Sequence, residues 1–151
     1  MKLRFLLPAI VLATHRLAVA APLQLGTAAV SINPSDGIGL AGYYHERGSD
    51  GVLDDIQAKA VVFDDGRTRA AIVICDLISM PKWIVSSARQ RIEAKTGIPG
   101  SNVLIAATHT HTAPVLYRES IRDNLDGGAR PLSRDYSTAL PARIAGAVAQ
   151  A

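Results

Sequence analysis

Two apolar, β-branched runs joined by a turn signal place the strongest constraint on how this chain can fold. Residues 56–63 and 69–77 have the valine and isoleucine content that is typical of strands. Between them stands the segment DDGR at 64–67, in which Asp65 and Gly66 favour the positive-φ backbone of a tight turn. The sequence therefore predicts a β-hairpin near the middle of the chain.

A helix and a further strand are predicted after the hairpin. The helix lies between Pro81, which suits a first helical turn, and Gly97, which suits a C-cap. Its apolar side chains repeat at intervals of four, namely Ile84, Ala88 and Ile92. After a break, the apolar run at 102–107 is typical of a buried strand. Strand, helix and strand at these lengths form a βαβ unit, so part of the sheet must be parallel.

The two ends of the chain add one strand and one helix to this unit. Residues 25–32 predict a strand that stops before Pro34, and the loop at 35–51 is rich in glycine. Residues 136–151 predict a helix from an apolar repeat of period four, Leu140, Ile144 and Val148. We therefore expect an α/β fold: a mixed sheet with a β-hairpin followed by a βαβ unit, and a site at the carboxyl end of a buried strand.

The first twenty residues have the order of a secretory signal peptide. The cations Lys2 and Arg4 precede the apolar run 5–13, and the triplet at 18–20 reads Ala-Val-Ala, an A-x-A cleavage site. The apolar run is too short to span a bilayer. An uncleaved interfacial anchor is the alternative interpretation. We expect a signal peptide over 1–20, a mature chain over 21–151, and a secreted or periplasmic protein.

The charge of the mature chain gives no indication of a nucleic-acid partner. The full chain has 16 basic and 13 acidic residues, but three of the basic ones and none of the acidic ones lie in the first twenty. The expected mature chain therefore has 13 of each, and its basic excess disappears. A nucleic-acid partner is not expected, because such binding requires a clustered basic surface on the folded domain.

The single cysteine, Cys75, excludes an intramolecular disulfide. It stands at the end of the apolar run 70–75, and no activating base is visible near it in the sequence. We interpret it as a small buried hydrophobe.

Two of the four histidines lie together in the segment AATHTHTAP at 106–114, directly after the last predicted strand. Ligands of open α/β sheets bind beyond the carboxyl ends of the strands. Side chains at i and i+2 of an extended segment point to one side, so His109 and His111 can face one cavity, where two neutral imidazoles suit zinc. The threonines between and beside them would face the other way and could make supporting hydrogen bonds. Structural histidines are the alternative, because two ligands do not complete a zinc site.

The glycine-rich loop carries a second motif that must be weighed. Residues 37–42 fit the pattern G-x-G-x-x-G, which binds dinucleotides when a strand precedes it directly and a helix opens within it. Pro34 ends the preceding strand early, and no helical apolar stripe follows Gly42. We therefore expect these glycines to allow tight turns near a pocket wall. Tyr43 and His45 could contribute to such a wall, although an exposed loop histidine is the simpler expectation.

Several segments in order resemble the N-terminal part of the neutral, non-lysosomal ceramidase family. The matching segments are Ala41-Gly42-Tyr43, Gly51 to Asp55 leading to Ala58-Lys59-Ala60, Phe63 to Gly66, Cys75-Asp76-Leu77, and Thr108 to His111 followed by Pro114. They run from about Leu25 to Pro114. The resemblance implies a secreted or periplasmic zinc amidohydrolase that cleaves the N-acyl bond of ceramide to sphingosine and fatty acid. It also implies possible contact with a membrane surface through the lipid substrate.

The resemblance assigns roles to the two histidines. His109 resembles the zinc ligand of this segment, and His111 would lie beside the metal as a catalytic group that orients substrate or water. The chain departs from the family at Leu53, where a histidine is common, and at 112–114, where Ser-Gly-Pro is common. These departures leave both histidines in place, so the implied substrate is ceramide or a related lipid amide. Asp76 stands near the same strand end, but we expect it to cap a loop.

The length of the chain sets it apart from the family it resembles. Family members are several times longer, and their remaining zinc ligands, a further histidine, a glutamate and a tyrosine, come from segments beyond residue 151. We therefore expect residues 21–151 to be the N-terminal part of a truncated ceramidase-like catalytic domain, itself inactive. Two alternatives stay open: a non-catalytic exported binding or structural module, and a different metal-dependent amidohydrolase.

Overall fold

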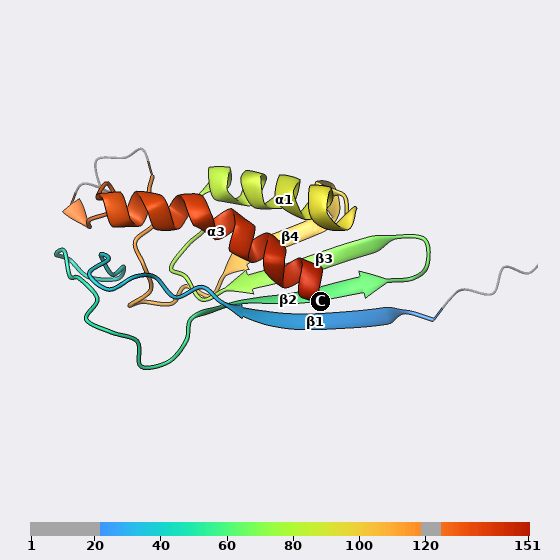
Figure 1. The fold of residues 1–151 in the computed structure, drawn as a ribbon, viewed down its shortest axis with the longest axis horizontal. Helices are drawn as coiled ribbons and strands as arrows, with labels where there is room; N and C mark the ends of the chain where they lie inside the picture. Colours follow the sequence, from blue (N-terminus) through green and yellow to red (C-terminus); the bar gives the residue numbers. More distant parts are fainter. Residues whose placement is uncertain (1–21, 119–124) are drawn as a thin grey trace, which may run out of the picture.

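A computed structural model describes residues 22–118 and 125–151 (Figure 1). The signal peptide expected over 1–20 and the segment 119–124 therefore lie outside the described residues. The elements follow in the order β1 (Gln24–Ser31), β2 (Gln57–Asp64), β3 (Arg69–Cys75), α1 (Lys82–Thr96), the 3₁₀ turn η1 (Gly100–Asn102), β4 (Val103–Ala107) and α3 (Pro131–Gln150).

The four strands form one mixed sheet in the order β1-β2-β3-β4. β1 pairs antiparallel with β2, and β2 pairs antiparallel with β3. β4 returns through α1 to lie parallel to β3, with Val73 opposite Ile105. The predicted fold class, a hairpin followed by a βαβ unit, is confirmed. The strand boundaries differ from the predicted ones by one or two residues at most ends.

The hairpin turn is built as its sequence predicts. Gly66 has a φ of 81°, in the left-handed region. The Asp65 carboxylate accepts hydrogen bonds from the backbone N–H of Arg67 and Thr68, at 2.9 and 2.7 Å. These bonds stabilise the ionised carboxylate, so they lower the pKa of Asp65 below its ordinary value of 3.8. The turn thus fixes the register of β2 and β3, with Asp64 opposite Arg69.

Both helices cover the same face of the sheet (Figure 1). The predicted stripe of α1, Ile84, Ala88 and Ile92, is fully buried between α1, α3 and the sheet, and the predicted stripe of α3 is buried with it. α3 begins at Pro131 rather than at residue 136, because proline suits the first turn of a helix and Ser133 faces the interior. None of the helices in the described residues is long and apolar enough to cross a membrane.

The opposite face of the sheet carries apolar side chains without helices over them. Leu25, Ile72 and Leu104 are 62%, 39% and 52% exposed there. The covered face is lined instead by small side chains, among them Ala58, Ala60 and Ala71, which let the helices approach closely. Cys75 lies on that covered face, fully buried, and burial raises the pKa of its thiol to about 12. The prediction that it is a small core residue is confirmed.

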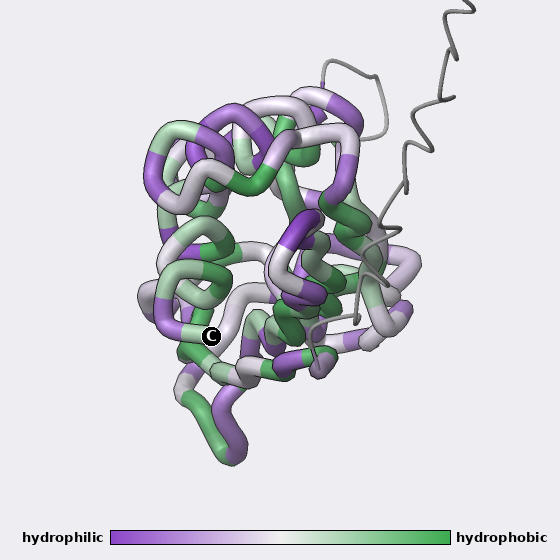
Figure 2. Tube along the Cα trace, turned by 90° about the vertical axis from the view of Figure 1, so that its right-hand side faces the viewer, coloured by the Kyte–Doolittle hydropathy of each residue, from purple (hydrophilic) through white to green (hydrophobic). Residues whose placement is uncertain are grey.

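Two long connections leave the sheet at the carboxyl ends of β1 and β4. The loop between β1 and β2 projects below the sheet (Figure 1), and the lowest part of the tube in Figure 2 is hydrophobic on one arm and hydrophilic on the other. The segment after β4 turns back across this loop. Backbone hydrogen bonds join the two, from Ala41 N–H to the Ala113 carbonyl at 2.8 Å and from Thr112 N–H to the Ala41 carbonyl at 2.9 Å.

Candidate functional site

The histidine segment lies at the carboxyl end of β4, beside the carboxyl end of β3. Because β3 and β4 are parallel, these ends meet at the same edge of the sheet. The Thr108 N–H donates to the Cys75 carbonyl at 3.0 Å, and the Thr110 N–H donates to the Leu77 carbonyl at 3.1 Å. The segment is thus tied to the chain that leaves β3, and both histidines follow the carboxyl end of a strand, as predicted.

His109 has an unusual backbone conformation, and one hydrogen bond orients its ring. Its φ is 66°, in the left-handed region that non-glycine residues rarely adopt. Its Nδ1 lies 2.8 Å from the carbonyl oxygen of Ile78. A carbonyl can only accept, so Nδ1 donates, and in the neutral imidazole the lone pair is then on Nε2. This is the tautomer of a histidine that ligates a metal through Nε2 while a backbone carbonyl orients its ring.

His111 lies beside His109 in the same cavity, which has a volume of about 460 Å³. The two ring centroids are 5.4 Å apart, and the rings meet edge to face at 68°. The structure therefore brings both predicted residues together. However, the segment is not a continuous extended strand, because His109 and Thr112 both have positive φ. The two imidazoles share one side through these local turns, and not through the strand alternation that the sequence analysis assumed.

The threonines lie on the other side of the segment, as predicted. Thr110 and Thr112 line a neighbouring cavity of about 500 Å³, together with Asp76. Their hydroxyls bond within the segment: Thr108 pairs with Thr110 at 2.6 Å, and Thr112 donates to the His111 carbonyl. The His109 ring is oriented instead by its hydrogen bond to the Ile78 carbonyl, which accepts. This partner was not predicted, because every residue has a backbone carbonyl and the sequence does not mark the one used.

The remaining walls of the histidine cavity come from four further segments, one of which, the turn before α3, contributes Asp126. The glycine-rich loop contributes Gly42, Tyr43 and Tyr44, the chain after β3 contributes Ile78 and Ser79, and the chain after the histidines contributes Val115, Leu116 and Arg118. Arg118 donates a hydrogen bond to the Ser79 hydroxyl. Tyr43 was considered as a wall residue from the sequence. Ser79 and Arg118 were not predicted, because only the packing of the loops places them beside the histidines.

Two other residues considered from the sequence do not join the histidines. Asp76 accepts hydrogen bonds from the Gln57 backbone N–H and from the Lys59 ammonium, both at 3.0 Å, so it ties the chain after β3 to β2, as a capping carboxylate does. His45 is exposed and does not line the cavity.

The glycine-rich loop is not a dinucleotide-binding turn. No helix opens within residues 37–42; the loop makes isolated bridges instead, between Gly39 and Gly48 and between Leu40 and Pro114. Gly37 and Gly42 have φ values of 82° and 96°. The expectation that these glycines allow tight turns beside a pocket is confirmed.

The histidine pair does not by itself make a metal site. Within residues 22–118 and 125–151, no group of three or more His, Cys, Asp or Glu side chains is placed to hold a metal ion. The donor set nevertheless fits zinc as far as it goes, since a neutral imidazole with a free Nε2 is a preferred zinc ligand.

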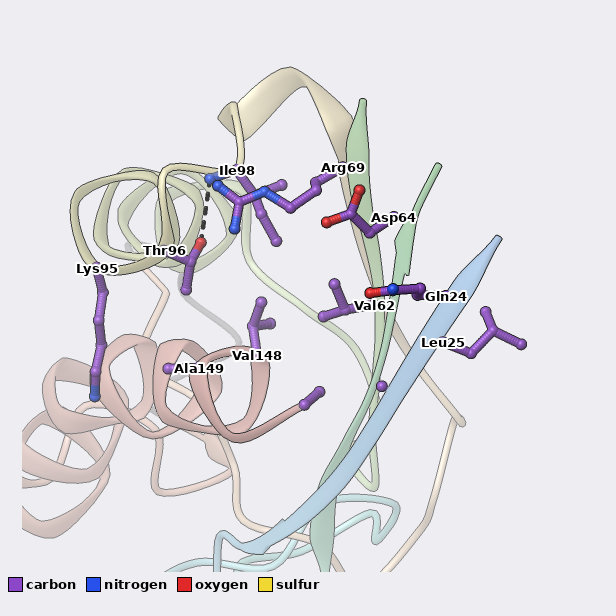
Figure 3. A pocket seen from close by; sticks show the side chains of 12 residues that line it. Gln24, Leu25, Val62, Asp64, Arg69, Lys95, Thr96, Ile98, Val148 and Ala149 are labelled. Carbon is purple, nitrogen blue, oxygen red and sulfur yellow. Dashed lines mark hydrogen bonds between the residues drawn. The ribbon is translucent and has the colours of Figure 1, made fainter. Parts of the chain in front are cut away.

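A third cavity, of about 570 Å³, lies far from the histidines. It opens between the end of α3 and the opposite edge of the sheet, where Asp64, Arg69 and Lys95 lie (Figure 3). It is more open, and its charged side chains converge on no common point (Figure 3). The histidine cavity is therefore the better candidate, although it is the smaller of the two.

Comparison with known proteins gives a likeness of fold. No family model matches the chain, and no curated protein matches it. Two solved structures do: a neutral ceramidase from Pseudomonas aeruginosa, with a TM-score of 0.71, and a ceramidase complexed with C2, with a TM-score of 0.73. Each is 24% identical and covers 87% of this chain, which spans 21% of each of those chains. The described chain therefore has the fold of one segment of a neutral ceramidase, as the sequence resemblance implied.

Proposed function

We propose that this chain is the N-terminal part of the catalytic domain of a zinc-dependent hydrolase of the neutral ceramidase type. The substrate would be ceramide or a related lipid amide, cleaved at its N-acyl bond. The observation that carries the proposal is the Nδ1 hydrogen bond of His109 to the Ile78 carbonyl, which leaves Nε2 available beside His111 on a ceramidase-like fold.

In this proposal the two histidines have different roles. His109 would ligate zinc through Nε2, since its ring is already oriented by a backbone carbonyl. When bound, zinc would supply Lewis-acid polarisation of the amide carbonyl and acidify water to a pKa of about 7. His111, whose ring meets that of His109 edge to face, would orient the attacking water or hold the scissile oxygen. The remaining ligands would come from outside the described residues.

The walls of the cavity suit a lipid amide. Ile78, Val115 and Leu116 present apolar surface beside the polar ends of the histidines and Arg118. An apolar lining with a few convergent polar groups is the usual composition of a site for a largely apolar ligand. Tyr44 stands fully exposed at the mouth, where it could meet a membrane surface that holds the substrate. Export to the periplasm or outside the cell is part of the same proposal.

The alternatives differ in what the described residues support. A non-catalytic exported module is favoured by the lack of a three-ligand group among residues 22–118 and 125–151. An amidohydrolase barrel would need parallel strands throughout, and the antiparallel pairing of β1, β2 and β3 disfavours it.

Zinc titration of three histidine variants tests the proposal. In a protein extended to supply the remaining ligands, His109→Ala should abolish tight zinc binding. His111→Ala should keep most of the metal and lower turnover of a fluorescent N-acyl sphingosine by roughly 10²–10³-fold. His45→Ala is the matched control and should change neither, because His45 is an exposed loop residue away from the cavity.

The 151-residue chain alone should bind zinc weakly and show no amidase activity, because two imidazoles leave coordination incomplete. Equal zinc affinity in the parent and in His109→Ala would show that the histidines are structural, and the proposed function would then have only the fold likeness to support it.

A further inference from the structure

Gly42 lies directly beside the imidazole of His111, although the hairpin, α1 and β4 lie between the two residues in the sequence. A Cβ atom added at Gly42 would lie 2.4 Å from His111 Nδ1, 2.5 Å from Cγ and 2.8 Å from Cβ. Real Cβ atoms do not come within 3.0 Å of other heavy atoms, so any side chain at residue 42 requires His111 to move. Rotation of the ring about its own axis would not relieve the overlap, because Cγ and Cβ are among the atoms met.

The backbone on both sides prevents either residue from withdrawing. Ala41, next to Gly42, both donates to the Ala113 carbonyl and accepts from Thr112, at 2.8 and 2.9 Å. Val115 N–H donates to the Gly39 carbonyl at 2.8 Å, which extends the same pairing. Gly42 itself has a φ of 96°. The glycine-rich loop and the histidine segment are thus joined beside the contact, and they hold the two residues at this separation.

The contact fixes a ring that little else holds. The His109 ring is oriented by the Ile78 carbonyl, whereas no hydrogen bond to the His111 ring is present among the described residues. The position of His111 relative to His109, with centroids 5.4 Å apart, therefore depends on the surface that Gly42 presents.

We propose that Gly42 is a positioning residue that sets the placement of the His111 imidazole against His109. The consequence for catalysis rests on the proposed function, in which His111 orients water or substrate. The placement itself does not, because it follows from the contact and the backbone pairing alone. An alanine at residue 42 would displace the imidazole or force the two loops apart.

Gly37 offers a matched control within the same loop. Its φ is 82°, so an alanine there meets the same left-handed strain, but the nearest atom to its added Cβ is Leu132 Cδ1 at 3.8 Å, an ordinary contact. Gly37→Ala should therefore lower the Tm by roughly 3–6 °C through backbone strain alone. Gly42→Ala should lower it further, because it adds the clash with His111.

The experiment compares Gly37→Ala, Gly42→Ala and the double variant Gly42→Ala/His111→Ala in the 151-residue chain. We expect Gly42→Ala alone to shift the His111 ring signals in NMR spectra and to remove the cross-peaks between the two imidazoles. Gly37→Ala should leave both unchanged. The double variant should regain a Tm near that of Gly37→Ala, since the atoms that the new methyl group meets have been removed.

Unchanged His111 signals in Gly42→Ala would overturn the proposal. If Gly42→Ala does not fold, the double variant decides: recovery of folding supports the contact, and a double variant as unstable as Gly42→Ala refutes it. None of these readouts requires zinc or turnover. If Gly42→Ala loses the cross-peaks between the two imidazoles and the protein does not bind zinc, the placement of His111 is supported and only the proposed function is contradicted.

Discussion

The sheet with its two helices and the two loops at its carboxyl edge are built on different principles. In the sheet and helices, backbone groups pair in regular ladders, and the turns use glycine where φ is positive, as at Gly66 and Gly97. In the loops, a histidine and a threonine adopt positive φ as well as glycines. Conformations of this kind cost energy and persist only where the surroundings impose them, which is why they concentrate at functional sites.

The two regions also differ in the side chains that they carry. The covered face of the sheet buries small and branched apolar residues, whereas the loops point imidazoles, a guanidinium and tyrosines toward a cavity. A rigid body that carries reactive groups on tied loops is the usual division between stability and function. Substitutions in the two regions should therefore behave differently.

The largest expected difference is in chemical reactivity between a core thiol and an exposed one. Burial raises the pKa of Cys75 from 9.0 to about 12, so the folded protein should hold about a thousandfold less thiolate than an ordinary cysteine at the same pH. Alkylation by iodoacetamide should be negligible in the folded chain and rapid in urea. Fast labelling of the folded protein would show that the sheet and helices open more readily than their burial indicates.

The next largest effect is on the stability of the core. Ile92→Ala removes a fully buried side chain between α1 and the sheet and should lower the free energy of unfolding by about 2–5 kcal/mol. Leu104→Ala on the open face of β4 is the control, and it should cost less, because Leu104 is 52% exposed. Urea denaturation followed by circular dichroism measures both. Similar losses would mean that the open face of the sheet is covered in solution.

In contrast to the core substitutions, replacing a strained loop residue by glycine should raise the free energy of unfolding. Thr112 has a φ of 67°, and a β-branched residue is strained there, so Thr112→Gly should raise the free energy of unfolding by about 1 kcal/mol. Thr110→Gly is the control: it also loses one hydroxyl contact but relieves no positive φ, and it should be destabilising by about 0.5–1 kcal/mol. If both variants lose stability, the loops are less strained than their φ values indicate.

The smallest effect is expected at the hairpin turn. The lowered pKa of Asp65 means that its ionised form stabilises the folded state above pH 3.8, and that this contribution is lost as the pH falls below that value toward the folded-state pKa. Asp65→Asn should therefore be slightly less stable than the parent at pH 7. The two should converge in acid, measured as Tm against pH, and a constant difference across that range would exclude the carboxylate charge as the cause.

The sequence by itself determined the elements whose signals are local. Asp65 and Gly66 specified the hairpin turn, the period-four stripe specified α1 and the face it buries, and the apolar run before Thr108 specified β4. Strand, helix and strand in that order required the parallel pairing of β3 and β4. Local patterns also placed His109 and His111 just beyond the carboxyl end of β4, although this strand is exposed on one face at Leu104 and not buried as predicted. They did not place the start of α3, where Pro131 and the buried Ser133 extend the helix beyond its apolar repeat.

The tertiary structure decided how the histidines are held. The carbonyl that orients His109 belongs to Ile78, 31 residues away, and the surface that confines His111 belongs to Gly42. Neither contact has a sequence signal, because a carbonyl is present at every residue and a glycine shows only that a side chain is missing. The positive φ of His109 likewise arises from hydrogen bonds to the chain after β3, which only the folded sheet brings within reach.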